Sequence, residues 1–204
     1  MYSAGACWGH DLRDVMDAAE LERPVVVAWS LGGIVVSAYL QLYGDERLAG
    51  VNWVGAIPAF VPELGASFAM QLASRLASPH AEERVEALVA WFHACYGTPS
   101  LDAMHERLLA ATGNALTMAH TIGVPQIEDP STALRAFARP ALVTQGAKDR
   151  LTPPAVAARL AEQLRACTLS VYDDAGHACF AEVPDRFNRE LLAFVERCHG
   201  TDAS

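Results

Sequence analysis

Residues 25–36 read VVVAWSLGGIVV, a run in which one serine stands between two apolar segments. The first five residues are apolar and mostly β-branched, which predicts a strand buried on both faces of a parallel sheet. The residues from Leu31 to Tyr43 favour a helix that Gly44 ends. Ser30 is therefore expected at a sharp strand-to-helix turn, with its hydroxyl presented at the apex and its backbone strained.

A serine at such a turn has two interpretations. The small residues Ala28 and Gly32 on either side of Ser30 let strand and helix cross closely, which predicts a nucleophile elbow in which Ala replaces the usual first glycine. The N-terminus of the following helix favours negative charge, so the Leu31 N–H would be one donor of an oxyanion hole. The alternative is an ordinary N-cap serine.

The rest of the chain alternates between strand and helix patterns. Further strands are predicted at 50–57, 140–146 and 168–173, and helices at 11–22, 31–43, 153–165 and 184–198. This alternation predicts an α/β fold, with a mostly parallel sheet flanked by helices. In such sheets functional residues collect at the carboxyl ends of the strands.

The segment 62–130 differs from the rest because it shows no strand pattern. Helical pieces are predicted at 63–77, 81–95 and 101–111, separated by prolines and glycines. We therefore expect a helical insertion at 62–130 in a core made of residues 1–61 and 131–204.

Two further polar residues follow predicted strands. Asp149 lies in QGAKDRLTPP after the strand at 140–146, and His177 lies in DDAGHACFAEVP after the strand at 168–173. Alone, Asp149 could be a turn or helix-capping residue, and His177 could be a structural histidine. In the chain order Ser, Asp, His, however, each of the three residues follows a strand, which is the order of one known type of catalytic triad.

With these motifs the chain resembles the α/β-hydrolase superfamily, most closely its esterase, perhydrolase and cofactor-free haloperoxidase branch. The resemblance rests on VVVAWSLGG, LVTQGAKDRLTP and DDAGHACFAEVPDRFNRELLAFV, and it extends from about Asp11 to Val195. It implies that Ser30 attacks a carbonyl carbon, that His177 is general base and then acid, and that Asp149 orients His177. It also implies that 62–130 is a lid, that an acyl-enzyme forms, and that no cofactor is needed.

Family members usually carry several strands before the serine strand, and a glycine-containing loop that supplies a second oxyanion N–H. Only 24 residues precede Val25, so the fold is expected to be N-terminally truncated. The pair Gly9-His10 adjoins a predicted helix and follows no strand, so we interpret it as coincidence. The sequence favours a fragment of a longer hydrolase over two alternatives. These are a gene model whose start is placed too late, and a chain whose sheet edge pairs with another chain. Self-association through the exposed edge strand 25–29 is therefore a possible consequence.

Several aromatic and thiol side chains are weaker candidates. Trp29, Trp91 and His93 are candidate substrate-pocket residues, although ordinary core packing accounts for Trp29 equally well and for His93 better. Cys179 lies two residues from His177, but a Cys–His pair would leave Ser30 unexplained, so a buried thiol is expected.

Composition excludes several classes of partner. The formal charge is −9, from 15 basic and 24 acidic residues, which argues against nucleic acid and anionic membranes. The five cysteines form no CxxC pattern, and the histidines show no metal-ligand spacing such as HExxH, so no metal is expected. No membrane-length apolar run or secretion signal is apparent, and a cytoplasmic location is expected.

The sequence thus predicts a serine hydrolase that acts on a small or medium carboxylic ester. Two alternatives stay open. One is a catalytically impaired truncated hydrolase or an interaction module that uses its edge strand. The other is acyl transfer to an acceptor different from water, such as peroxide or an alcohol.

Overall fold

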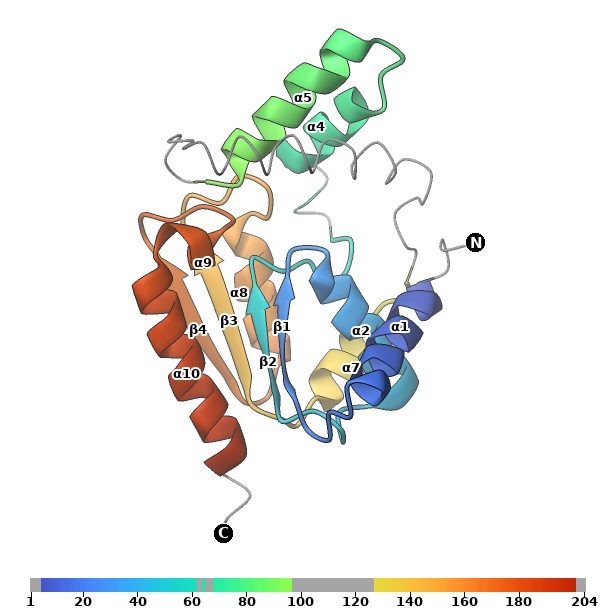
Figure 1. Ribbon diagram of the computed structural model, residues 1–204, viewed down its shortest axis with the longest axis vertical. Coiled ribbons are helices and arrows are strands. Elements are labelled where there is room, and N and C mark those ends of the chain that lie inside the picture. Colours follow the sequence, from blue (N-terminus) through green and yellow to red (C-terminus); the bar gives the residue numbers. More distant parts are fainter. Residues whose placement is uncertain (1–4, 62–63, 65–67, 97–126, 201–204) are drawn as a thin grey trace.

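A four-stranded parallel sheet forms the centre of the molecule (Figure 1). The computed structural model describes residues 5–61, 64, 68–96 and 127–200. Within these residues the strands are β1 (Val25–Trp29), β2 (Gly50–Val54), β3 (Ala141–Gly146) and β4 (Cys167–Tyr172), and they lie in the order β1-β2-β3-β4. Each strand pairs in parallel with its neighbour. The predicted α/β class with a parallel sheet is confirmed.

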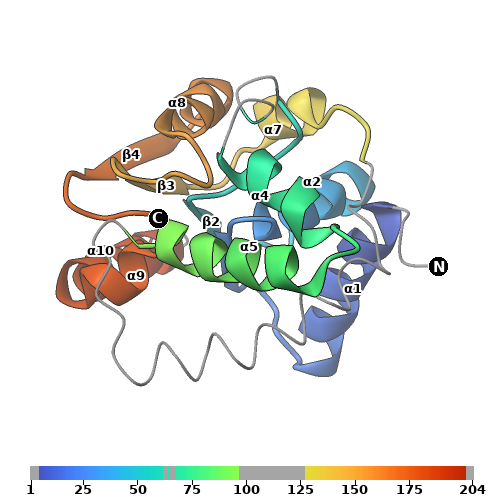
Figure 2. The same cartoon turned by 90° about the horizontal axis from the view of Figure 1, so that it is seen from above.

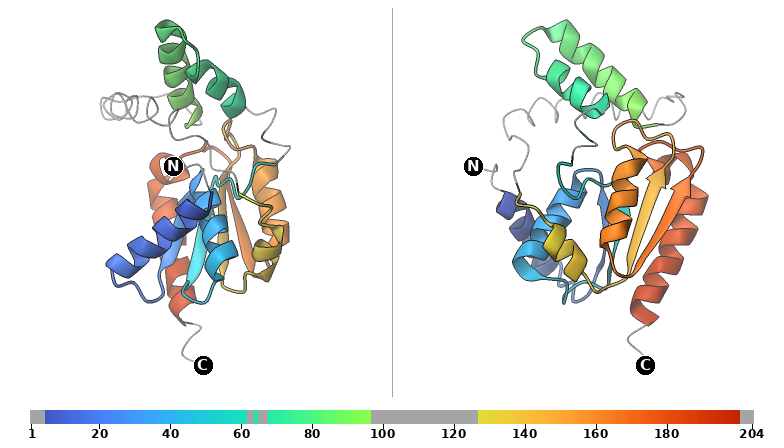
Figure 3. Two further views of the ribbon diagram at one scale, coloured as in Figure 1. Left: turned by 90° about the vertical axis from the view of Figure 1, so that its right-hand side faces the viewer. Right: turned by 180° about the vertical axis from the view of Figure 1, so that it is seen from behind.

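Helices cover both faces of this sheet (Figure 3). The helices α2 (Gly32–Tyr43), α7 (Ser131–Ala136) and α8 (Pro154–Gln163) lie on one face, where Trp53 and Val143 of the sheet join their main apolar cluster. The helices α9 (Cys179–Glu182) and α10 (Pro184–Gly200) cover the other face, where Leu142 packs against Phe194. Alternate residues of β3 therefore face opposite layers, as burial on both faces predicts.

The segment between β2 and β3 carries two helices that lie beyond the carboxyl ends of the strands (Figures 1 and 2). These are α4 (Phe68–Leu76) and α5 (Ala81–Ala94), which pack on each other through Leu72, Leu76 and Ala87. We call this pair the α4–α5 hairpin. The helix predicted at 101–111 lies outside the described residues.

The first helix differs from its predicted position. The helix α1 spans Gly5–Ala18, whereas 11–22 was predicted, and the chain leaves the helix just before Glu20, whose φ is +53°. Gly9 therefore lies inside α1, where a Cβ atom would come within 2.9 Å of backbone and side-chain atoms of α2. This glycine permits the close crossing of α1 and α2. The short helices α7 and α9 were not predicted, because four to six residues hold too little periodicity to identify a helix.

The strand β1 forms one edge of the four-stranded sheet. Its side chains Val27 and Trp29 are 45% and 42% exposed, whereas the residues of β2 and β3 are all buried. The expected apolar edge strand is thus present in the described part of the chain. Among the same residues, none of the helices combines the length and apolar character that crossing a bilayer requires.

The two glycines after Ser30 have different steric roles, which gives a paired prediction. At Gly33 a Cβ atom would lie 2.5 Å from the Ile57 carbonyl oxygen, whereas at Gly32 the nearest atom is the Ala28 Cβ at 3.9 Å. We expect Gly33→Ala to lower the free energy of unfolding by about 1–3 kcal/mol, because a backbone carbonyl cannot rotate aside. Gly32→Ala should leave it nearly unchanged, since 3.9 Å is an ordinary contact. Denaturant unfolding measures both, and equal losses would contradict the assignment.

Candidate active site

Ser30 occupies the tight turn between β1 and α2. Its φ is +55°, a left-handed conformation that costs free energy for a residue other than glycine. The Ser30 N–H donates to the Val54 carbonyl at 3.1 Å, and the Ser30 carbonyl accepts from Gly33 and Ile57. The N-cap residue of α2 is Leu31, so the N-cap interpretation of Ser30 is wrong. The strained turn that the motif predicts is confirmed.

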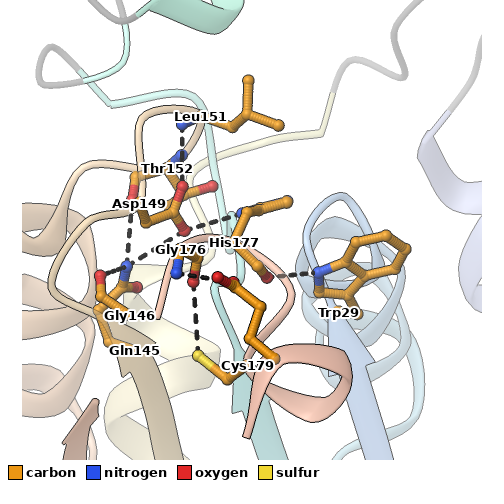
Figure 4. Close-up of polar contacts among 10 residues, drawn as sticks. Trp29, Gln145, Gly146, Asp149, Leu151, Thr152, Gly176, His177 and Cys179 are labelled. Carbon is orange, nitrogen blue, oxygen red and sulfur yellow. Dashed lines mark hydrogen bonds and ion pairs between the residues drawn. The ribbon is translucent and has the colours of Figure 1, made fainter. Parts of the chain in front are cut away.

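Asp149 follows β3 and uses both of its carboxylate oxygens. Oδ1 accepts the backbone N–H groups of Leu151 and Thr152, each at 2.9 Å, which shapes the loop before α8. Oδ2 accepts from the Gln145 side chain at 3.2 Å and lies 2.8 Å from His177 Nδ1 (Figure 4). The turn-forming and histidine-orienting interpretations of Asp149 are therefore both met, one by each oxygen.

His177 follows β4 and is almost completely buried, with 2% of its surface exposed. A carboxylate can only accept hydrogen bonds, so the 2.8 Å contact assigns the ring proton to Nδ1 and leaves the Nε2 lone pair available. This is the tautomer that a general base requires.

Three neighbouring elements hold the loop that carries His177, and Figure 4 shows the contact from Trp29. Glu182 of α9 accepts from the Gly176 N–H at 2.7 Å, and the Trp29 indole of β1 donates to the His177 carbonyl at 2.9 Å. At the end of α5, the Cys95 carbonyl accepts from the Ala178 N–H at 3.0 Å. The position of the imidazole thus depends on the sheet edge, the α4–α5 hairpin and α9 together.

Two glycines that the sequence did not single out make room for the His177–Asp149 pair. A Cβ atom at Gly55 would lie 3.0 Å from His177 Nδ1 and 3.1 Å from Asp149 Oδ2, and the φ of Gly55 is +48°. A Cβ atom at Gly146 would collide with the carbonyl oxygens before His177. The sequence marks these two glycines only by position: Gly55 directly follows the buried strand β2, and Gly146 ends the buried strand β3.

A cavity of about 120 Å³ lies beside Ser30. Ser30 and Leu31 line it together with Met70 and Ala73 of α4 and Trp91 of α5. Of the three candidate pocket residues, Trp91 lines this cavity, whereas Trp29 and His93 are not among the lining residues. The Leu31 N–H lies at the N-terminus of α2, where no carbonyl of the helix itself can accept it, so it is suited to an oxyanion.

Trp29 contacts the imidazole instead of the cavity. Its indole ring lies 5.4 Å from the His177 ring, between centroids, and 5.1 Å from the Phe180 ring. Trp29 does not line this cavity, and its observed contact is with the histidine, so a pocket role for Trp29 stays a prediction. Since Trp29 precedes Ser30 directly, the serine and the imidazole lie in the same region, although no Ser30–His177 hydrogen bond is observed among the described residues.

The nearby thiols are poor nucleophiles. Burial, and then the Asp149 and Glu182 charges, raise the pKa of Cys179 to about 12. The same causes raise the pKa of Cys95 to about 12. Both groups are therefore uncharged thiols near neutral pH, and the thiolate is the reactive form. This supports the choice of Ser30 over Cys179.

A protein-family model described as the alpha/beta hydrolase fold matches residues 9–184. This chain belongs to the α/β-hydrolase fold family. The match includes Ser30, Asp149 and His177, so the family likeness and the site geometry refer to the same part of the molecule.

Relatives of this α/β hydrolase include esterases. A pimeloyl-[acyl-carrier protein] methyl ester esterase from Pectobacterium carotovorum is 29% identical, over 94% of this chain and 78% of the relative. The crystal structure of a putative aryl esterase from Burkholderia cenocepacia aligns with a TM-score of 0.83 and 27% identity, over 98% of this chain and 73% of the other. The non-heme chloroperoxidase CPO-A1 from Kitasatospora aureofaciens is 26% identical, over 92% and 73%. The chain is thus an esterase-like hydrolase, as its motifs predict.

A substitution at Gly55 tests whether the His177–Asp149 pair needs the space that this glycine leaves free. Gly55→Ala should reduce ester hydrolysis by about tenfold or more, because its methyl group contacts both partners of the pair and second-layer changes commonly cost that much. Initial rates measure the loss.

The control is Gly44→Ala. Gly44 also has a left-handed φ, +67°, but a Cβ atom there would meet nothing within 4 Å. Both variants should lose a similar amount of stability, about 1 kcal/mol or more, from backbone strain alone. If Gly44→Ala lost as much activity as Gly55→Ala, the loss would reflect strain and not contact with the pair.

Proposed function

We propose that this α/β hydrolase cleaves a small or medium carboxylic ester with the triad Ser30, His177 and Asp149. The observation that carries the proposal is the buried 2.8 Å contact between His177 Nδ1 and Asp149 Oδ2, next to a strained serine turn. A buried carboxylate is costly to fold unless it is well bonded, and here both oxygens of Asp149 have hydrogen-bond partners.

The proposed reaction proceeds in two half-reactions. Ser30 Oγ attacks the ester carbonyl carbon while His177 Nε2 takes the hydroxyl proton, and the Leu31 N–H stabilises the oxyanion that forms. Collapse of this intermediate expels the alcohol, which receives the proton from Nε2, and leaves an acyl group on Ser30. Water then attacks the acyl carbon while His177 Nε2 takes its proton. The bond between the acyl carbon and Ser30 Oγ breaks, Oγ recovers the proton from Nε2, and the carboxylic acid leaves.

The substrate class follows from the cavity and from the relatives. A cavity of about 120 Å³ is small for a ligand site, which favours a short acyl chain over a long one. The lining is apolar apart from Ser30 and Thr152, so it favours an uncharged acyl group. We propose that residues 62–130 act as a lid, because α4 and α5 supply part of this lining. The esterase activities named for the relatives point to the same reaction class.

The triad is tested with a fluorophosphonate probe and a short-chain p-nitrophenyl ester. Labelling and hydrolysis should both vanish in Ser30→Ala, and Asp149→Asn should slow hydrolysis by about 10³–10⁴ through loss of the correct histidine tautomer. Cys179→Ala is the control and should keep both activities, since its thiol is not ionised. Labelling that survives Ser30→Ala, or that disappears in Cys179→Ala, would refute the assignment.

Acyl transfer to peroxide is a second candidate, favoured by the likeness to a chloroperoxidase. The same acyl-enzyme would form, and hydrogen peroxide would replace water in the second half-reaction to yield a peracid. Adding hydrogen peroxide to the ester assay and detecting peracid separates the two candidates.

We also propose that the chain self-associates through β1, in a cytoplasmic setting. The support is the position of β1 at the sheet edge with exposed apolar side chains, and the absence of disulfides among all five cysteines, which are within the described residues.

Light scattering coupled to size-exclusion chromatography tests whether the chain self-associates through β1. The mass should rise with concentration, and Val27→Lys should keep the protein monomeric, since an edge lysine disfavours strand pairing. Leu192→Lys places the same charge on an exposed apolar position of α10, and association should persist. A monomer at every concentration would rule out the edge proposal.

A further inference from the structure

Gln145 is a buried amide on β3 whose side chain reaches the loop that carries Asp149 (Figure 4). Only 1% of its surface is exposed. Its Nε2 atom lies 3.0 Å from the Gly146 carbonyl oxygen, 3.2 Å from Asp149 Oδ2 and 3.2 Å from the Thr152 carbonyl oxygen. Since all three oxygens are acceptors, the atom facing them has to be the N–H₂ group, which fixes the orientation of the amide.

The other end of the amide has no partner. Gln145 Oε1 is buried and accepts no hydrogen bond among the described residues. Burying a carbonyl oxygen without a partner costs free energy, and an apolar side chain at this position would avoid that cost. The hydrogen bonds donated by the N–H₂ group of Gln145 therefore have to offset the cost of its unpartnered carbonyl oxygen.

That interaction completes the hydrogen bonding of Asp149. Two backbone N–H groups hold Oδ1, while Gln145 and His177 share Oδ2. Within the described residues, Gln145 and His177 are the two side chains that bond to this carboxylate. Without Gln145, rotation about the Cβ–Cγ bond of Asp149 would be resisted only from the Oδ1 side and by His177 itself.

We propose that Gln145 is a positioning residue for catalysis, which holds Asp149 Oδ2 toward His177 Nδ1. This inference rests on the proposed function, because it presupposes that His177 acts as the base for Ser30. Gln145 acts through Asp149 and does not touch the reacting atoms.

The main test replaces the amide with a side chain of similar length that cannot donate. Gln145→Met should lower kcat by about 10- to 100-fold with little change in KM, because orientation of the base matters in the transition state. The matched control is Thr144→Val on the neighbouring position of β3. Thr144 donates a buried hydrogen bond to Asn52 at 3.0 Å, so its loss weakens the same strand without touching Asp149. Thr144→Val should keep the kcat of the unaltered chain.

A second variant gives a readout that strand weakening alone would not produce. Gln145→Glu places a carboxyl group beside Asp149, and only its protonated form can donate to Oδ2. Its activity relative to the unaltered chain should therefore rise as the pH is lowered from 8 to 6. For Gln145→Met, the same ratio should stay constant. A constant ratio in both variants would overturn the inference.

Histidine NMR separates this inference from the proposed function. In the unaltered chain the Nδ1 proton of His177 should appear as a downfield resonance, which Gln145→Met shifts or broadens and Thr144→Val leaves in place. That pattern supports the positioning role even if the chain hydrolyses no ester. An unchanged resonance and unchanged kcat in Gln145→Met would refute it, as would an equal loss of kcat in Thr144→Val.

Discussion

The hydrogen bond between His177 Nδ1 and Asp149 Oδ2 is the contact around which the carboxyl end of the sheet is organised. It joins the loops that follow β3 and β4, two strands that pair along their whole length. The bond fits between these loops because Gly55 and Gly146 have no side chains to fill the space. The parallel sheet brings the two residues near each other, and the glycines allow them to bond.

The serine turn between β1 and α2 departs from the usual family motif at one position, residue 28. Ala28 replaces the usual first glycine of the serine turn, yet a Cβ atom at Gly32 would still lie 3.9 Å from it. The close contact in this turn lies instead between Gly33 and the Ile57 backbone. The strain at Ser30 is thus held by three backbone hydrogen bonds to the end of β2 and to α2, and the identity of residue 28 matters less than the motif alone implies.

The order of strands and helices could be predicted because prolines and glycines mark most of the boundaries and β1, β2 and β3 are mostly apolar. Ser30, Asp149 and His177 could be placed at the same edge of the sheet because each follows a parallel strand, and the contact between His177 and Asp149 is observed. Trp29 could not be placed from its local pattern, since its partner His177 lies 148 residues further along the chain. The role of Gly55 could not be predicted for the same reason. A side chain there is excluded by Asp149 and His177, which are distant in the sequence.

The hydrogen bond from the Ala178 N–H to the Cys95 carbonyl links the end of α5 to the loop that carries His177. The α4–α5 hairpin forms one wall of the cavity at Ser30, and Cys95, directly after α5, accepts the hydrogen bond from the peptide unit that follows His177. Any outward swing of α5 must either break this tie or drag the histidine loop with it. In the proposed mechanism, an outward movement of α5 would therefore widen the cavity and displace His177, the proposed base, at the same time.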